Sequence, residues 1–391
     1  MKKIAILLDA SITNDGRVQR VATSLSVVNK VDLYCTNVKE SDIKMFKQYN
    51  VTLIEHKVEN GWFLRNVMMH NRFVDLFNKV IGSGEKYDVI YCNDYPLLSI
   101  SSQIKNKLKA KLVYDSHEIY IATINQFFPT KGIKKAFGLF MISLNRFIHS
   151  FIEKKTLKNV DLMLTVCDSF KNYFEKKYKI MNVGVLKNCP KIYSFPVKSQ
   201  ILKDKLNLSD SDKIILYQGN INKGRGIEKL ILAAPDFEKE IHFVVMGSGN
   251  EKEELLALKE NMNLRNVHFI DKVPFNDLLN YTASADVGIL LIESINVSKE
   301  LTLPNKVFEY MAAGIPFITN YLPEASKIVE DVDCGYVIND KYSKEIAISL
   351  NEIMRNLDAN KGINGQLAIK SKFNWDNEFI DVLTNIQNLT A

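Results

Sequence analysis

The stretch 303–319, LPNKVFEYMAAGIPFIT, brings three polar side chains to the start of a short helix. The helix is expected over residues 307–313, with Asn305 and Lys306 at its mouth and Glu309 on its first turn. A helix N-terminus carries partial positive charge and free N–H groups, so with a lysine beside it this segment suits a diphosphate. Glu309 is then free to bind sugar hydroxyls. The alternative is structural, with Glu309 complementing the helix dipole and Lys306 on a solvated face.

Residues 213–226, KIILYQGNINKGRG, form a second candidate phosphate-binding segment. A strand expected over 214–217 runs into a loop with three glycines, Lys223 and Arg225, and a helix follows. Successive backbone N–H groups in such a loop can surround an anion. The spacing fits neither a Walker A loop nor G-x-G-x-x-G after a first strand, so we expect neither of those nucleotide-binding folds.

Polar residues also follow strands in the first half of the chain. Residues 115–118, Asp-Ser-His-Glu, follow the fifth expected strand, and residues 93–94, Asn-Asp, follow the fourth. Ligands of open parallel sheets bind beyond the carboxyl ends of the strands. This cluster therefore favours a functional role for His117, although a lone histidine is more often structural. The Asn/Asp/Gly turn over 11–17, which opens a helix at Gly16, is equally compatible with an ordinary connection.

Short apolar, β-branched runs alternate with longer helical patterns, which predicts an α/β fold with parallel, doubly wound sheets. The runs are residues 4–8, 31–35, 51–55, 89–92, 111–114, 162–166 and 183–186, then 214–217, 241–246, 267–270, 287–291, 316–319 and 335–338. Two such domains in tandem are expected, with boundaries at 1–192, 193–372 and a last segment, 373–391. The joint falls between Cys189 and Lys198, where prolines flank a non-periodic stretch.

The chain has 391 residues, a length typical of two domains, and its 46% hydrophobic and 25% charged content indicates a globular protein. No apolar run approaches the roughly 18 residues of a membrane-spanning helix. The short apolar run after the N-terminal lysines reads as a first strand rather than a signal peptide. Five scattered cysteines without C-x-x-C spacing favour a reducing compartment and argue against a zinc site.

The charge is uneven, with 30 Lys and Arg against 17 Asp and Glu over residues 1–195, and 21 against 28 in the remainder. A first half of charge +13 beside a second of −7 predicts an anionic partner for the first half. Two stretches stand out there: the aromatic, methionine-rich 61–69, and 133–152 with phenylalanines at helical spacing and basic residues nearby. The second could lie on an anionic membrane. A long core helix is the alternative.

Taken together, these motifs resemble the family 4 retaining glycosyltransferases of the GT-B fold. The likeness covers nearly the whole chain and is most specific in Pro-Asn-Lys-x-Phe-Glu-Tyr-Met-Ala-x-Gly-x-Pro, from Pro304. Weaker motifs follow the family's order: Asp-Gly-Arg-Val-x-Arg from Asp15, Asp-x-His-Glu from Asp115, the Gly-rich start of the second domain, and Gly-x-Gly from Gly247. The segment from Phe373 resembles the family's last helix.

The resemblance implies two Rossmann-like domains facing a central cleft, with a C-terminal helix that crosses back to the first domain. It implies transfer of a hexose or N-acetylhexosamine from a UDP- or GDP-linked donor, without a metal and with retention, in surface polysaccharide or glycoconjugate biosynthesis. The acceptor is expected to be a glycan or lipid-linked, bound by the first domain, with the protein cytoplasmic, at the inner face of the membrane. Nucleic acid is not an expected partner, because the basic residues are dispersed and no aromatic stacking platform is recognisable.

By position in the family's motifs, the implied catalytic residues are His117 near the reacting carbon, Arg225 on the phosphates and Glu309 on the ribose. The backbone at Lys272 and Val273 is expected to meet the base. The full set of implied donor-binding residues is Gly16, Gly219, Asn220, Lys223, Arg225, Gly247, Lys272, Val273, Leu303, Asn305, Lys306 and Glu309. Preorganised cations would stabilise the charge that grows on the leaving diphosphate.

Two positions depart from the family's pattern. Leu301 stands where a second glutamate is frequent, so we expect backbone groups of the 301–303 loop to replace an acidic contact to the donor sugar. Asn220 replaces an arginine, for which Lys223 is expected to compensate. Two other functions therefore stay open. One is a non-catalytic sugar-nucleotide-binding subunit that supports a partner transferase. The other is a sugar-nucleotide epimerase of the same architecture, which needs acid/base carboxylates facing the sugar.

Overall fold

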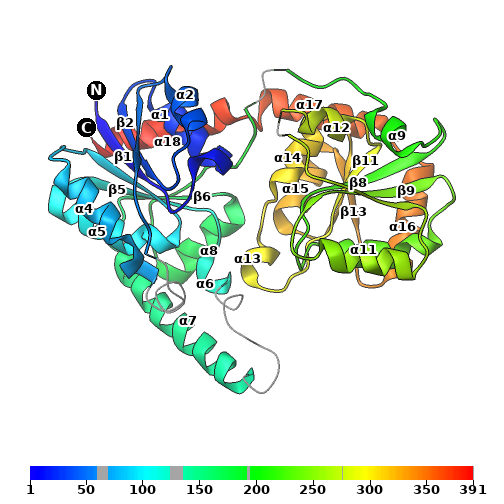
Figure 1. The fold of residues 1–391 in the computed structure, drawn as a ribbon, viewed down its shortest axis with the longest axis horizontal. Coiled ribbons are helices and arrows are strands. Elements are labelled where there is room, and N and C mark those ends of the chain that lie inside the picture. Colours follow the sequence, from blue (N-terminus) through cyan, green and yellow to red (C-terminus); the bar gives the residue numbers. More distant parts are fainter. Residues whose placement is uncertain (60–68, 124–134, 192–193, 275, 391) are drawn as a thin grey trace. The chain divides into compact units, whose positions relative to one another are not determined.

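The computed structural model describes residues 1–59, 69–123, 135–191, 194–274 and 276–390. The chain forms two compact units, Met1–Asn188 with Trp375–Ala391, and Cys189–Asn374 (Figure 1). Each unit is built on one parallel sheet, seven-stranded in the first and six-stranded in the second. The predicted α/β class with two Rossmann-like domains is confirmed.

The first sheet has the order β3-β2-β1-β4-β5-β6-β7. Its strands are β1 (Lys3–Leu7), β2 (Lys30–Cys35), β3 (Val51–Glu55), β4 (Val89–Asn93), β5 (Lys111–Ser116), β6 (Leu162–Thr165) and β7 (Val183–Val185). The chain runs outward from β1 in both directions, and right-handed crossovers then place helices on both faces. The order reverses between β1 and β4, the position at which ligands bind in open sheets.

The helices of this unit connect successive strands and close the chain. They are α1 (Gly16–Leu25), α2 (Glu40–Phe46), α4 (Val74–Gly82), α5 (Tyr95–Leu108), α6 (Tyr120–Thr123), α7 (Lys135–Leu157), α8 (Asp168–Tyr178) and α18 (Trp375–Leu389), with 3₁₀ turns at Ile12–Asn14 and Met69–Phe73. The apolar face of α18 (Trp375, Phe379, Val382, Ile386) belongs to the same core as β1 and α1. The last helix is therefore part of the first unit.

The second sheet has the order β10-β9-β8-β11-β12-β13, all parallel. Its strands are β8 (Lys213–Asn220), β9 (Ile241–Ser248), β10 (Val267–Ile270), β11 (Val287–Leu290), β12 (Phe317–Asn320) and β13 (Gly335–Ile338). Its helices are α9 (Ile201–Leu206), α10 (Ile227–Ala233), α11 (Lys252–Asn261), α12 (Leu278–Ala283), α13 (Val297–Glu300), α14 (Asn305–Ala312), α15 (Pro323–Val332), α16 (Ser343–Arg355) and α17 (Ala359–Ser371), with a 3₁₀ turn at Ala234–Asp236. Here the order reverses between β8 and β11, so the end of β8 is the expected binding edge.

Helix α7 differs from the other helices in the side chains it exposes. The aromatic stripe found in the sequence is on the surface, with Phe137, Phe147 and Phe151 64%, 74% and 64% exposed. The interpretation of this stretch as a core helix is therefore wrong for the stripe. Residues 61–68 of the other aromatic stretch lie outside the described part of the chain. All five cysteines are buried, and none of them forms a disulfide in the described part of the chain.

Candidate active site

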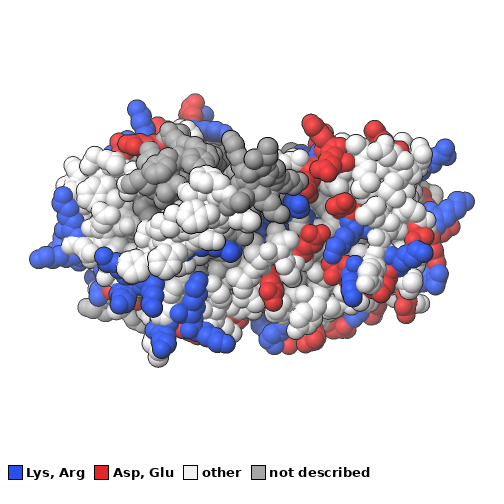
Figure 2. Space-filling view, turned by 90° about the horizontal axis from the view of Figure 1, so that it is seen from below, with Lys and Arg blue, Asp and Glu red and all other residues white. Residues whose placement is uncertain are grey.

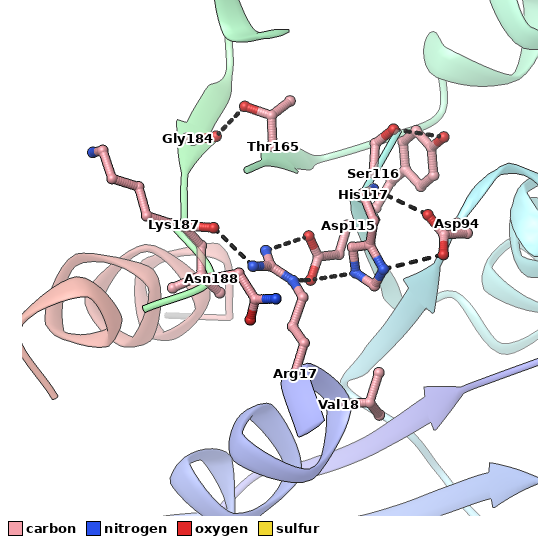
Figure 3. Close-up of polar contacts among 12 residues, drawn as sticks. Arg17, Val18, Asp94, Asp115, Ser116, His117, Thr165, Gly184, Lys187 and Asn188 are labelled. Carbon is pink, nitrogen blue, oxygen red and sulfur yellow. Dashed lines mark hydrogen bonds and ion pairs between the residues drawn. The ribbon is translucent and has the colours of Figure 1, made fainter. Parts of the chain in front are cut away.

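A buried ion pair joins α1 to the carboxyl end of β5. Arg17 donates from Nε to Asp115 Oδ2 at 2.9 Å and from Nη2 to Asp115 Oδ1 at 2.7 Å. The Tyr91 hydroxyl donates to Oδ2 at 2.8 Å, and Arg17 Nη1 donates to the Leu186 carbonyl at 2.8 Å. Figure 3 shows how this guanidinium bridges the elements that end at the sheet edge. The two side chains are almost fully buried, so the pair fixes the positions of α1, β5 and the segment after β7.

His117 lies directly after β5, between two carboxylates (Figure 3). Its Nδ1 is 3.1 Å from Asp94 Oδ2, its Nε2 is 3.4 Å from Asp115 Oδ2, and its backbone N–H donates to Asp94 Oδ1 at 3.0 Å. Burial alone would lower the pKa of His117, but the charges of Asp94 and Asp115 outweigh it and raise the pKa to about 10. The imidazole therefore holds its proton at neutral pH. It can supply positive charge and hydrogen bonds but does not accept a proton.

Asp94 is a site residue to which the sequence assigned no role of its own. Its backbone φ is +62°, a conformation uncommon for a residue with a Cβ atom, and its N–H donates to the Asp115 carbonyl at 2.9 Å. Strain of this kind persists where surrounding contacts over-determine it, which is common at functional sites. The sequence signal was its place directly after β4. Its partnership with His117 follows from the pairing of β4 with β5, in which Asn93 lies opposite Asp115.

The residues around Gly16 mainly build the first unit. Asp15 caps α1 by accepting a hydrogen bond from the Val18 N–H at 2.9 Å, and Gly16 is the first residue of the helix. The guanidinium of Arg20 lies 4.8 Å from the ring centroid of Trp375, on α18. A structural role thus accounts for Asp15 and Arg20. The donor contact of Gly16 stays a prediction.

In the second unit, helix α14 begins earlier than predicted. It runs from Asn305, so Asn305 and Lys306 are in its first turn, and Glu309 is in its second turn rather than its first. The reason is that Pro304 takes the N-cap position with extended backbone, φ −69° and ψ 137°. Asn305 is exposed, and Leu303, which precedes the cap, is 6% exposed. The side chain of Lys306 consequently leaves from the helix start toward the end of β8.

The ammonium group of Lys306 is buried, and no hydrogen-bond partner exists for it in the described part of the chain. It lies 3.7 Å from the ring centroid of Tyr217. Burial and the nearby charge of Arg225 hold the pKa of Lys306 well below its ordinary value, against the opposing effect of Glu309. A buried ammonium without an acceptor is unfavourable. Its placement indicates a binding point for an anion.

The carboxylate of Glu309 is held by a hydrogen bond within the second unit, and its contact with sugar hydroxyls stays a prediction. Its Oε2 accepts a hydrogen bond from Gln218 Nε2 at 2.6 Å, and the Thr282 hydroxyl contacts Gln218 Oε1 at 2.7 Å. Gln218 ends the buried part of β8, and Thr282 is fully buried on α12. This chain of hydrogen bonds fixes the carboxylate of Glu309 at the carboxyl edge of the sheet.

Two glycines allow the ends of β8 and β9 to approach each other. A Cβ on Gly247, whose φ is +155°, would lie 1.9 Å from the Gly219 carbonyl oxygen. A Cβ on Gly219, whose φ is +111°, would lie 2.9 Å from Lys306 Cε. Strand β8 continues through Asn220, which pairs with Ser248. Gly219 and Asn220 were predicted to lie in a loop, but they are strand residues. Gly219 thus makes room for the Lys306 side chain.

The loop between β8 and α10 carries the remaining predicted cations. Lys223 is exposed and Arg225 half-buried, and no hydrogen bond or ion pair of the Arg225 guanidinium is found among the described residues. The charge of Arg225 helps to lower the pKa of Lys306, and it opposes the burial that raises the pKa of Tyr217. The guanidinium of Arg225 therefore acts electrostatically on the same residues as the Lys306 ammonium group. Among residues 1–59, 69–123, 135–191, 194–274 and 276–390, no cluster of three or more metal-ligating side chains occurs.

The remaining predicted donor residues follow other strands and helices of the second unit. Lys272 is exposed and Val273 half-buried, and both follow β10 directly. Leu301, the position where the family frequently has a glutamate, is the half-buried C-cap of α13. The roles of these residues stay predictions.

Residues 198–364 match the family described as Glycosyl transferases group 1. This part of the chain is therefore similar to the group 1 glycosyltransferases. The matched region contains β8, the Gly219–Arg225 segment and all of α14, so it includes Lys306 and Glu309.

Two relatives illustrate the similarity. The chain is 29% identical over 168 residues to WcaI of Escherichia coli K12, a glycosyl transferase named for colanic acid biosynthesis, covering 41% of each chain. It is 24% identical over 304 residues to the glycosyltransferase MJ1607 of Methanocaldococcus jannaschii, covering 75% of this chain and 73% of that protein. With WcaI, the chain therefore aligns over less than half of the relative's length.

Solved structures share the fold of the whole chain. Sucrose-phosphate synthase from Thermosynechococcus elongatus superimposes with a TM-score of 0.75 at 16% identity, over 100% of this chain and 99% of that one. Anabaena HepE, solved in complex with UDP and glucose, gives 0.73 at 15% identity over 99% and 100%. At these identities the likeness establishes the two-domain fold alone.

Proposed function

We propose that this protein is a retaining, metal-independent glycosyltransferase. It transfers a hexose or N-acetylhexosamine from a UDP- or GDP-linked sugar to a glycan or lipid-linked acceptor, in the biosynthesis of a surface polysaccharide or glycoconjugate. The family of residues 198–364 and the complex of HepE with UDP and glucose support a nucleotide-sugar donor.

The observation that carries the proposal is the buried ammonium group of Lys306 at the start of α14, which has no hydrogen-bond partner among the described residues and is affected by the charge of Arg225. A diphosphate supplies the acceptors that this ammonium group lacks, and it also meets the N-terminal N–H groups of the helix. Glu309, held by Gln218, is one turn further along α14 and accepts hydrogen bonds from hydroxyl groups of the donor. The second unit thereby contributes the donor site.

The chemistry then depends on charge rather than on a carboxylate nucleophile. The bond from the anomeric carbon to the leaving diphosphate oxygen breaks, and the acceptor hydroxyl forms its bond on the same face. The hydroxyl proton passes to the departing diphosphate oxygen. Lys306, Arg225 and Lys223 stabilise the negative charge that grows on the diphosphate, in a site organised before the reaction.

His117 contributes from the first unit as a fixed cation. Since the pKa of His117 is raised to about 10, it stays protonated while the donor sugar is bound. In this proposal its positive charge stabilises the donor, and it does not act as a general base. In this proposal the first unit binds the acceptor at the cytoplasmic face of the membrane.

The proposal is tested by nucleotide release from UDP-, GDP-, ADP- and dTDP-sugars, with a lipid-linked acceptor extract. We expect release from one donor, reduced at least a hundredfold in Glu309→Ala and in His117→Ala. Lys344→Ala, an exposed position in the second unit, serves as the control that leaves the rate unchanged. Binding of a nucleotide without release from any donor, with or without acceptor, would instead identify a non-catalytic subunit.

A further inference from the structure

Helix α7 has its polar and apolar faces reversed relative to a normal surface helix. Its exposed face carries five large apolar side chains at intervals of three and four residues, which form one stripe. The residues of this stripe and their exposed fractions are Phe137 64%, Phe140 63%, Leu144 40%, Phe147 74% and Phe151 64%. We call these five residues the α7 stripe. In Figure 1, α7 runs along the lower edge of the first unit, and its N-terminal end extends beyond the other helices.

The opposite face of α7 is buried and carries polar side chains next to Ile142, which is 5% exposed. Asn145, His149 and Glu153 are each 1% exposed. The Tyr95 hydroxyl lies 2.9 Å from His149 Nδ1, and the Tyr178 hydroxyl of α8 donates to Glu153. Hydrogen bonds therefore hold this face against the unit, and they fix which side of the helix points outward. These contacts keep the α7 stripe exposed, because turning the stripe inward would break the hydrogen bonds of the buried face.

The surroundings of the α7 stripe are basic. Lys154 and Lys155, on the turn after Phe151, are exposed, and Glu153 is the only acidic residue between Lys135 and Leu157. Helix α8, joined to α7 through Tyr178, ends with two lysines of its own. Figure 2, seen from the side on which α7 lies, shows mainly uncharged and basic atoms over the first unit. An apolar stripe bordered by cations matches the boundary between acyl chains and anionic headgroups.

We propose that the α7 stripe is a membrane-docking surface that inserts its phenylalanines into the interface of a bilayer containing anionic lipids. None of the described helices is long and apolar enough to cross a membrane, so α7 lies in the plane of the interface. The inference rests on the proposed function in one respect: a lipid-linked acceptor is presented at such a surface. Lys154 and Lys155 contact the headgroups while the stripe enters the acyl boundary.

The test is co-sedimentation of the full chain with vesicles of 70% phosphatidylcholine and 30% phosphatidylglycerol, a composition chosen for the experiment. We expect binding that weakens with added salt. The double variant Phe147→Ser with Phe151→Ser should lower the partition coefficient at least roughly tenfold, since burying one phenylalanine is worth more than about 1.4 kcal/mol. The variant Lys154→Glu with Lys155→Glu should lose binding to these vesicles and keep any weak binding to pure phosphatidylcholine.

A matched control exists in the second unit. Ile363 and Leu367 on α17 have the same spacing and are 55% and 57% exposed. Ile363→Ser with Leu367→Ser should leave vesicle binding unchanged. The melting temperatures of both double variants should equal that of the wild type, because each removes only exposed side chains.

Other occupants of the surface give different results. If the wild type forms a dimer that Phe147→Ser with Phe151→Ser converts to a monomer, and vesicles are not bound, the stripe is an interface between two copies and the inference is overturned. Absence of vesicle binding together with donor-dependent nucleotide release overturns the docking surface and leaves the transferase intact. Vesicle binding that depends on the stripe supports the docking surface even where no donor reacts.

Discussion

Arg17 and Asp115 are 98 residues apart in the sequence, and two hydrogen bonds of 2.9 and 2.7 Å join them in the interior of the first unit. The carboxylate also faces His117, which in turn faces Asp94. Positive and negative groups thus alternate along this line, with each charge next to an opposite one. The two motifs that supply Arg17 and His117 depend on each other through Asp115, because neither cation would be held in place without it.

Replacing Arg17 by methionine should destabilise the first unit by about 3–5 kcal/mol, because Asp115 is left buried without its main counter-ion. Trp375 is fully buried in the first unit, so tryptophan fluorescence during urea unfolding reports on that unit. Lys44→Met is the matched control, since it breaks an exposed ion pair with Glu40. That control should cost no more than about 0.5 kcal/mol. Equal costs for the two variants would contradict a structural role for the buried pair.

The strands were predictable because parallel strands buried on both faces give continuous apolar runs between helical patterns. All thirteen expected runs are strands, and β3, β10 and β13 have the expected bounds. The end of β8 was not predictable from hydrophobicity. Gly219 and Asn220 continue the strand because they pair with Gly247 and Ser248, and this pairing depends on glycines whose conformation is set by the neighbouring strand.

The site was predictable only in part. The sequence identifies which polar residues follow the strands, but it does not identify the residues that hydrogen-bond to them. Glu309 and Lys306 stand out from the motif around Pro304, but the hydrogen bond from Gln218 to Glu309 spans 91 residues. Asp94 was overlooked for the same reason, since it meets His117 only through strand pairing. The α7 stripe shows the limit of periodicity: helical spacing of apolar residues identifies one face, and the contacts of the opposite face decide whether it is buried.

Asp94→Asn should change the pH dependence of nucleotide release. In the wild type the pKa of His117 is about 10, so the imidazolium persists through neutral pH. Loss of one carboxylate lowers this pKa, and burial lowers it further, so the variant should lose activity as the pH rises through about 7 and recover at pH 6. Rates measured from pH 5.5 to 9.5 should fall with rising pH in Asp94→Asn but not in Asp168→Asn, a control at an exposed position.

The same substitution should affect stability with a defined sign. The folded-state pKa of His117 is raised above its ordinary value of 6.5, so the contribution of the pair is fully present below that pH and is lost as the pH rises through about 10. The difference in unfolding free energy between wild type and Asp94→Asn should be largest near pH 6 and shrink toward pH 10. A difference that grew with pH would contradict a protonated His117.

Gly219→Ala and Gly247→Ala separate backbone packing from donor binding. In Gly247→Ala the new Cβ meets the Gly219 carbonyl, which is backbone and cannot move aside, so the second unit should lose at least about 3 kcal/mol. In Gly219→Ala the Cβ meets the flexible end of Lys306. Backbone strain should lower the free energy of unfolding by about 1–2 kcal/mol. Nucleotide affinity should also fall, because the new Cβ displaces the ammonium group of Lys306. Calorimetric titration with UDP and GDP, beside thermal melts, distinguishes the two effects.

Lys306→Met should make the protein more stable and less able to bind its donor. The ammonium group is buried without an acceptor, and an unsatisfied group of this kind costs about 1–3 kcal/mol, which methionine of similar length removes. The diphosphate loses a charged partner, so the dissociation constant for the nucleotide should rise roughly 10- to 100-fold, the equivalent of one hydrogen bond to a charged group. Lys344→Met, at an exposed position outside the expected donor-binding residues, should change neither quantity by as much. A gain in stability with unchanged affinity would show that Lys306 binds no phosphate, whereas a loss of stability would show that Tyr217 and the helix already satisfy it.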